Sequence, residues 1–120
     1  MTITPIQAQV TKTAAFVGSG VDVSGFIGDW TLKIRVSKLT AAKNVRFQFT
    51  DSVDAFTNKG AGHTLCFSGG VDAAADVVRS ITRYNAPTLR MGVASAVLRL
   101  EVTAIDAGGS VDYSAWLESA

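Results

Sequence analysis

The stretch WTLKIRVS, Trp30 to Ser37, decides the fold class, because apolar and polar residues alternate along it without interruption. Successive side chains of a β-strand point to opposite faces, so one set is expected in a core and the other in solvent. The apolar set is Trp30, Leu32, Ile34 and Val36, and the polar set is Thr31, Lys33, Arg35 and Ser37. The stretch therefore predicts a half-buried strand.

The same alternation returns further along the chain. After KLTAAKN comes NVRFQFTD, with Val45, Phe47 and Phe49 on the inward positions, and we expect it to form a hairpin with the first strand. AVLRLEVTAID, Ala96 to Asp106, is the longest alternating run. The glycines of AGGS that follow suit a tight turn, which predicts a second hairpin with VDYSAWLE.

Shorter runs of β-branched and aromatic residues complete an all-β pattern of about eight or nine strands. They are Ile6 to Val17, Val21 to Val23, Thr64 to Ser68, Asp76 to Tyr84 and Leu89 to Val93. VDAAAD, Val71 to Asp76, is too short for a stable helix. So many short strands predict a two-sheet β-sandwich of jelly-roll or Greek-key type. Residues 1–120 are expected to form a single domain, with residues 1–5 a possible flexible N-terminal arm.

The composition argues against several classes of partner. Eleven Lys and Arg residues balance ten Asp and Glu residues, for a formal charge of +1. Nucleic acid is therefore an unexpected partner, because a phosphate-binding surface needs a basic stripe. The single cysteine, Cys66, cannot form an internal disulfide. The start of the chain has no secretory signal pattern and no stretch is apolar enough for a membrane span, so we expect neither membrane nor export.

Two carboxylates, Asp51 and Asp54, lie three residues apart in DSVDAF. Together with Asp29 or Asp22 they could supply oxygen ligands to a calcium ion, which takes roughly six to eight. The motif lacks the denser oxygen ligands of a calcium loop, and Asp and Ser are typical of turns. We therefore expect a strand exit, without metal, cofactor or catalytic pair.

His63 and Cys66 could form a thiolate–imidazole pair, but an offset of three places them on opposite faces of a strand. We expect Leu65 and Phe67 inward and Cys66 on the other face. The glycine sets GSG, KGAGH and SGG lack the Gly-Lys-Ser/Thr ending of a phosphate loop. A cupin-like metal enzyme is the weakest alternative, since such sites need several histidines and His63 stands alone. No catalytic residue is predicted.

The polar side of the strands offers a better candidate for function. Trp116 alternates with Asp112 and Ser114, so we expect it to point away from the core, whereas Trp30 should be buried. In VVRSITRY, both faces of the expected strand would carry apolar residues. We predict an outward strip that suits a protein interface, where arginine and aromatic residues are enriched. Its residues are Val77, Arg79, Ile81, Arg83 and Trp116.

An alternative for the same region is a carbohydrate site. A flat aromatic ring on a β-sandwich can stack on a sugar, and Trp116 or Tyr84 could serve in this way. The aliphatic residues of the strip favour a protein partner over a sugar.

The run from Val21 to Phe56 resembles small virion proteins of tailed bacteriophages, of the capsid decoration or head-accessory type. The matching features are DVSGF, Gly28-Asp29-Trp30 before the alternating strand, LTAAKNVRF and DSVDAF. The resemblance implies a non-enzymatic β-sandwich that self-associates, as a trimer or larger ring, and that decorates or stabilises a capsid, with the major capsid protein as a further partner. It also implies a virion location after assembly in the bacterial host cytoplasm.

Overall fold

The computed structural model describes most of the chain. The described residues are 2–26, 28–40, 44–54, 56, 64–68, 76–86, 89, 91–92, 96–105 and 109–119. They form nine β-strands and one short 3-10 helix, η1 (Ser52–Asp54). No helix among them is long and apolar enough to cross a membrane.

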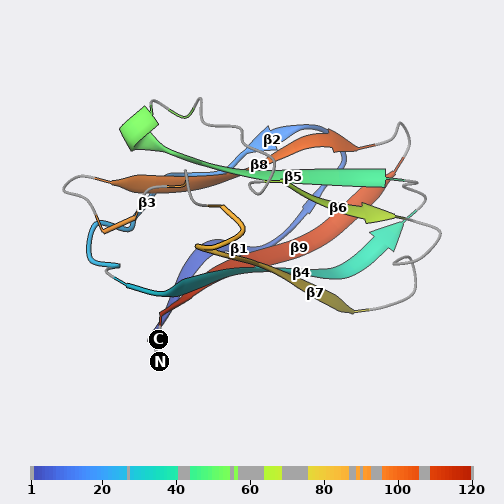
Figure 1. Ribbon diagram of the computed structural model, residues 1–120. Helices are drawn as coiled ribbons and strands as arrows, with labels where there is room; N and C mark the ends of the chain where they lie inside the picture. The colour runs from blue at the N-terminus through green and yellow to red at the C-terminus, as the bar shows by residue number, and fades with distance from the viewer. Residues whose placement is uncertain are drawn as a thin grey trace.

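The strands form two antiparallel sheets that lie one above the other (Figure 1). The first, here called the β4 sheet, has the order β1 (Thr2–Lys12), β9 (Ser110–Ser119), β4 (Trp30–Thr40), β7 (Val77–Thr82). The second, the β5 sheet, has the order β2 (Phe16–Val17), β8 (Val97–Ile105), β5 (Asn44–Asp51), β6 (Thr64–Ser68), and β3 (Val21–Asp22) also pairs with β8. The predicted β-sandwich is confirmed.

This strand order is that of a jelly roll. β5 and β6 pair with each other, and β2 and β3 both pair with β8. All other strands that follow one another among the described residues lie in opposite sheets. The chain thus passes back and forth between the sheets as two interlocked Greek keys. The beginning of β1 and the end of β9 lie side by side, with Thr2 opposite Ser119.

The core fills the space between the sheets, as the alternation predicts. Trp30 is 6% exposed, and Leu32, Ile34 and Val36, which follow it on the inward side of β4, are 0% exposed. Phe47 of β5 meets Tyr113 of β9 edge to face across the sandwich, with ring centroids 4.9 Å apart. This burial raises the pKa of the Tyr113 phenol to about 12. The predicted core position of Trp30 is confirmed.

Both predicted hairpins are wrong. The strand that contains WTLKIRVS is β4, and its expected partner β5 lies in the other sheet; β8 and β9 are likewise in opposite sheets. Alternation and turn residues show where strands begin and end, but a connection can equally well cross between sheets. In the structure β4 pairs with β9 and β7, and β8 pairs with β5.

Two smaller predictions also need correction. Residues 2–5 do not form a loose arm, because they belong to β1 and pair with β9. The expected strand from Leu89 to Val93 is not found in its described residues, where Gly92 has a φ of 73° and its amide donates to the Val23 carbonyl. The stretch VDAAAD lies outside the described residues except for Asp76.

Candidate interaction surface

The predicted outward strip does not exist as one surface, because β7 has the opposite phase. Ile81 lies opposite Leu32 of β4 and is only 2% exposed. Val77 also packs against the core. The outward residue is Val78, which lies opposite Arg35 and is 49% exposed. The predicted placement of Val77 and Ile81 is therefore wrong: the apolar residues of β4 draw Ile81 inward.

The two arginines of the strip lie apart from each other. Arg79 is on the inward phase of β7, at the edge of the sandwich, and its Nη1 donates to the Cys66 carbonyl of β6 at 2.7 Å. It therefore links the edges of the two sheets. Arg83 follows β7 in a turn and forms an ion pair with Asp29 at 3.2 Å.

Trp116 lies on the outer face of the β4 sheet, as predicted. Its indole Nε1 donates to Glu118 Oε2 at 2.7 Å, and Lys33 Nζ lies 3.1 Å from the same oxygen. Because Glu118 is two residues further along the same strand and face, the ring extends along β9 over the sheet. The hydrogen bond from Trp116, and after it the hydrogen bond from Lys33, lowers the pKa of the Glu118 carboxyl. The carboxylate thus fixes both the aromatic ring and the cation.

Aliphatic side chains flank this group on the two edge strands. Ile3 of β1 lies opposite Glu118 and is 55% exposed, and Val78 occupies the outer face of β7. Between them, Arg35 forms a two-bond pair with Asp76, which raises the pKa of Arg35 and lowers that of Asp76. The result is a surface with apolar edges and organised charges in the middle.

We call this outer surface of the β4 sheet the Trp116 face. Its residues are Ile3, Pro5, Thr31, Lys33, Arg35, Lys38, Val78, Ser80, Asp112, Ser114, Trp116 and Glu118. Of the predicted interface residues, only Trp116 belongs to it. Glu118 and Lys33 belong to strands in which polar and apolar residues alternate, so the sequence alone could have placed both side chains on an outer face. Their contacts around Trp116 depend on the pairing of β4 with β9.

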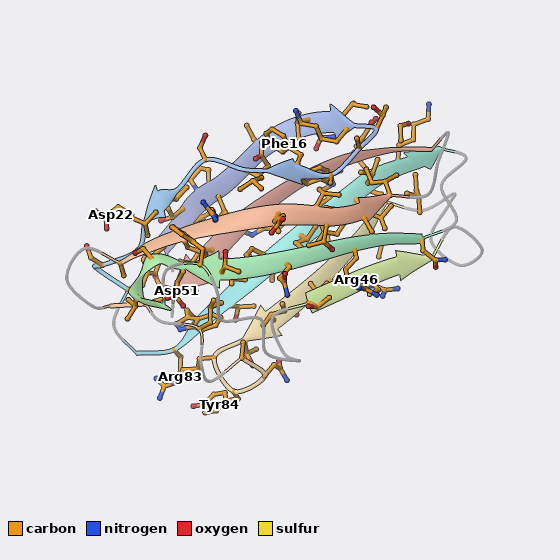
Figure 2. All side chains as sticks on the ribbon, turned by 90° about the horizontal axis from the view of Figure 1, so that it is seen from above. Phe16, Asp22, Arg46, Asp51, Arg83 and Tyr84 are labelled. Atoms are coloured by element: carbon orange, nitrogen blue, oxygen red, sulfur yellow. The ribbon has the colours of Figure 1, made fainter. Side chains whose placement is uncertain are left out.

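A second exposed feature lies in the turn after β7. Tyr84 is 73% exposed, its hydroxyl donates to Asp29 Oδ1 at 3.2 Å, and the Arg83 guanidinium lies 5.3 Å from its ring centroid. Asn85 Oδ1 fixes the turn by accepting from the amide and hydroxyl of Thr82. Figure 2 shows Arg83 and Tyr84 projecting together from the sandwich.

The carboxylates considered for calcium do not converge. Asp51 is buried at the end of β5, opposite Leu98. Asp22 binds the amide and hydroxyl of Ser24, which lower its pKa, and Asp29 binds Arg83 and Tyr84. Asp22 lies opposite Val97 and Asp51 opposite the inward Leu98, on the two sides of β8, so the two carboxylates do not share a face. The side chain of Asp54 is outside the described residues, and those described contain no cluster of three metal-binding groups.

DSVDAF is the strand exit that the sequence predicted. β5 ends at Asp51, and η1 follows directly. Ser52 Oγ accepts from the Val97 amide at 2.9 Å, and the Phe56 amide donates to the Asp51 carbonyl at 2.8 Å. Phe56 has a φ of 60°, a conformation that costs a non-glycine residue free energy, and its ring covers the Arg99 guanidinium at 3.7 Å. The motif therefore fixes a corner.

Cys66 is exposed on β6 and Leu65 packs against the core, as predicted. His63 lies outside the described residues, so the pairing considered for it stays a hypothesis.

Comparisons with known proteins place the chain in no family. No protein-family model matches the sequence, and no curated protein and no solved structure gives a match.

Proposed function

We propose that this chain is a non-enzymatic structural protein of a phage particle, a self-associating jelly roll that decorates or stabilises the capsid. The observation that carries the proposal is the Trp116 face, in which a fixed aromatic ring and paired charges lie between exposed Ile3 and Val78. Aromatic and arginine residues at the centre of a patch are typical of protein contacts. Viral capsid proteins are among the proteins that use the jelly roll.

The aliphatic edges favour a protein over a sugar as the partner. Ile3 and Val78 are 55% and 49% exposed, and burying such side chains against another protein is favourable by about 25 cal/mol per Å² of apolar area. A sugar ring would gain from Trp116 but little from these two residues. The phage setting itself rests on the resemblance of residues 21–56 to virion proteins.

Light scattering over a range of concentrations tests self-association. We expect the wild-type mass to exceed that of the 12.6 kDa chain, and Val78→Asp to reduce it without unfolding the domain. Asn44→Asp is the matched control, because it adds the same charge at an exposed position of β5 in the other sheet and should leave the mass unchanged. A monomer at all concentrations would contradict the proposal. Mass spectrometry of purified phage particles from the host strain that carries the gene tests the virion location.

The second candidate is a carbohydrate-binding module, which the corner at Tyr84 favours. An exposed ring flanked by the carboxylate of Asp29 and the guanidinium of Arg83 combines a stacking surface with groups that bind hydroxyls. A glycan array with wild type and Tyr84→Ala tests it. Binding that disappears in Tyr84→Ala, with a monomeric wild type, would favour the carbohydrate module over the structural protein.

A further inference from the structure

The charges of the Trp116 face are sorted by strand. The outward residues of β4 include three cations, Lys33, Arg35 and Lys38, and the outward residues of the adjacent β9 include two anions, Asp112 and Glu118. β4 is therefore the positive strand of the face and β9 the negative one, with Asp76 beside Arg35 at the β7 edge. Such a surface can be complementary to itself in one relative orientation.

That orientation follows from symmetry. When two copies meet face to face about a two-fold axis that runs parallel to the strands between β4 and β9, β4 of each copy lies over β9 of the other. An axis perpendicular to the strands within the interface would instead place β4 over β4, cation against cation. Like charges in contact across an interface are strongly unfavourable. The charge pattern selects the first axis.

The observed strand register then determines which residues meet. Lys33 is paired with Trp116, Arg35 with Ser114 and Lys38 with Asp112 within one copy, and the axis repeats these pairs between the copies. Each Lys33 would face the Trp116 ring of the other copy, a cation–π arrangement, and each Lys38 would face the other Asp112. The strands of packed sheets cross at about 30°, which shifts facing residues sideways as their distance from the axis grows. If the axis passes through the row of Arg35 and Ser114, the shift at Lys33 and Lys38 is small enough for their long side chains to span.

The same axis places the edge strand β7 of one copy over the edge strand β1 of the other. β7 of each copy would lie over β1 of the other, because these strands are at equal distances on the two sides of the central pair. Val78 is exposed on β7, and Ile3 is exposed on β1. The register puts Val78 in the row of Arg35 and Ser114 and Ile3 in the row of Thr31 and Glu118, so these two side chains do not meet across the contact, and charge complementarity alone selects the arrangement.

We propose that two copies of this chain pair through the Trp116 face about this axis, with β4 of each copy over β9 of the other. The pairing rests on the self-association proposed above and specifies its contact. A two-fold contact of this kind closes with two copies, so it predicts a dimer or an assembly built from dimers. This dimeric contact differs from the trimer or larger ring that the resemblance implies.

A charge reversal in trans tests the pairing. Lys38→Glu alone and Asp112→Lys alone each place like charges opposite each other in both halves of the contact, so each variant should be monomeric by light scattering. Mixed in equal amounts, the two variants should form a heterodimer. In that mixed pair the introduced carboxylate would face the introduced ammonium, and the unchanged Asp112 of one chain would face the unchanged Lys38 of the other. Lys38 and Asp112 are also neighbours within one chain, so each single variant loses an attraction there as well. Mixing the two variants does not restore that attraction within either chain, so a rescue by mixing must come from contacts between chains.

Arg46→Glu is the matched control, since Arg46 is exposed on the outer face of the other sheet and its reversal should leave the mass unchanged. Ser114→Glu is an independent gain-of-function variant: it places a carboxylate opposite Arg35 of the second copy and should tighten the dimer by about twofold or more. Thermal unfolding of every variant verifies that it is folded.

The outcomes separate the two proposals. Monomeric single variants with a heterodimer in the mixture support the pairing. If wild type is oligomeric and the single variants keep its mass, or if they dissociate and the mixture stays monomeric, the pairing is wrong and self-association stands. A wild type that is monomeric at every concentration overturns self-association itself.

Discussion

The outer faces of the two sheets differ in what covers them. On the β5 sheet, Gln48 and Thr50 occupy outward positions of β5, yet they are only 8% and 1% exposed. Beside them, Phe56 lies over Arg99. On the β4 sheet, the outward Val78 and Arg35 remain about half exposed.

The difference teaches that an outward position is not the same as an accessible one. Both β5 and β4 alternate as their sequences predict, and both present polar residues on the outer side. On the β5 sheet the outward side chains near the end of β5, Gln48 and Thr50, are buried, whereas Arg46 earlier on the strand is exposed. Two buried polar atoms of this covered part, Thr50 Oγ1 and Arg99 Nε, have no hydrogen-bond partner. The Trp116 face keeps its polar groups paired and reachable, which makes it the better candidate for an interface.

The largest expected effect separates inward from outward on β7. Ile81→Asp should abolish folding, because it places an unpaired charge in the core, a change that costs well above about 4 kcal/mol. Val78→Asp, three residues earlier on the outer side, should change stability by no more than about 0.5 kcal/mol in the monomer. Urea unfolding followed by circular dichroism measures both. Similar losses in the two variants would show that the face assignment of β7 is wrong.

The two tryptophans provide the next comparison. Trp30→Ala should lower the free energy of unfolding by about 3–5 kcal/mol, the usual cost of emptying a large aromatic site. Trp116→Ala should cost less, because its ring is only half-buried and lies on the outside. Acrylamide quenching of the single-tryptophan variants Trp30→Phe and Trp116→Phe provides an independent measurement. Greater accessibility of Trp30 would contradict the assignment of the two rings.

A smaller effect tests the covered face. Thr50→Val keeps the shape of the side chain and removes a buried hydroxyl that has no partner, so it should raise the free energy of unfolding by about 1 kcal/mol. The control is Thr31→Val on the accessible face of β4. Its free energy of unfolding should lie within about 0.5 kcal/mol of the wild-type value. A loss of stability in Thr50→Val would mean that the hydroxyl makes a stabilising interaction.

The smallest effect is a change in Trp116 fluorescence with pH. Hydrogen bonds from Trp116 and Lys33 hold the pKa of Glu118 below its ordinary value of 4.5, so this interaction favours the folded state above that pH. It is lost as the pH falls through the lowered pKa. In a Trp30→Phe background, the emission of Trp116 should therefore change with a midpoint below pH 4.5. Glu118→Gln should lack the transition; its persistence there would assign it to another group.

Local pattern was enough for much of the fold. Alternation in WTLKIRVS and NVRFQFTD correctly gave the inward residues of β4 and β5, and DSVDAF correctly gave the end of β5. The site was harder to predict. Both faces of a strand formed by VVRSIT carry apolar residues, so the sequence does not show which face of β7 is buried, and the prediction that Val77 and Ile81 point outward is wrong.

What the sequence determined by itself is most of the strand content, the sandwich class and the outward position of Trp116, because each depends on a period of two that neighbouring residues carry. Only the tertiary structure decided which strands pair. The placement of β4 beside β9 and β7 brings Lys33 and Glu118 to Trp116, turns Ile81 into the core and leaves Val78 outside. These pairings join residues far apart in the chain, and they are set by how the apolar faces of all the strands fit one core, a property that no single stretch contains.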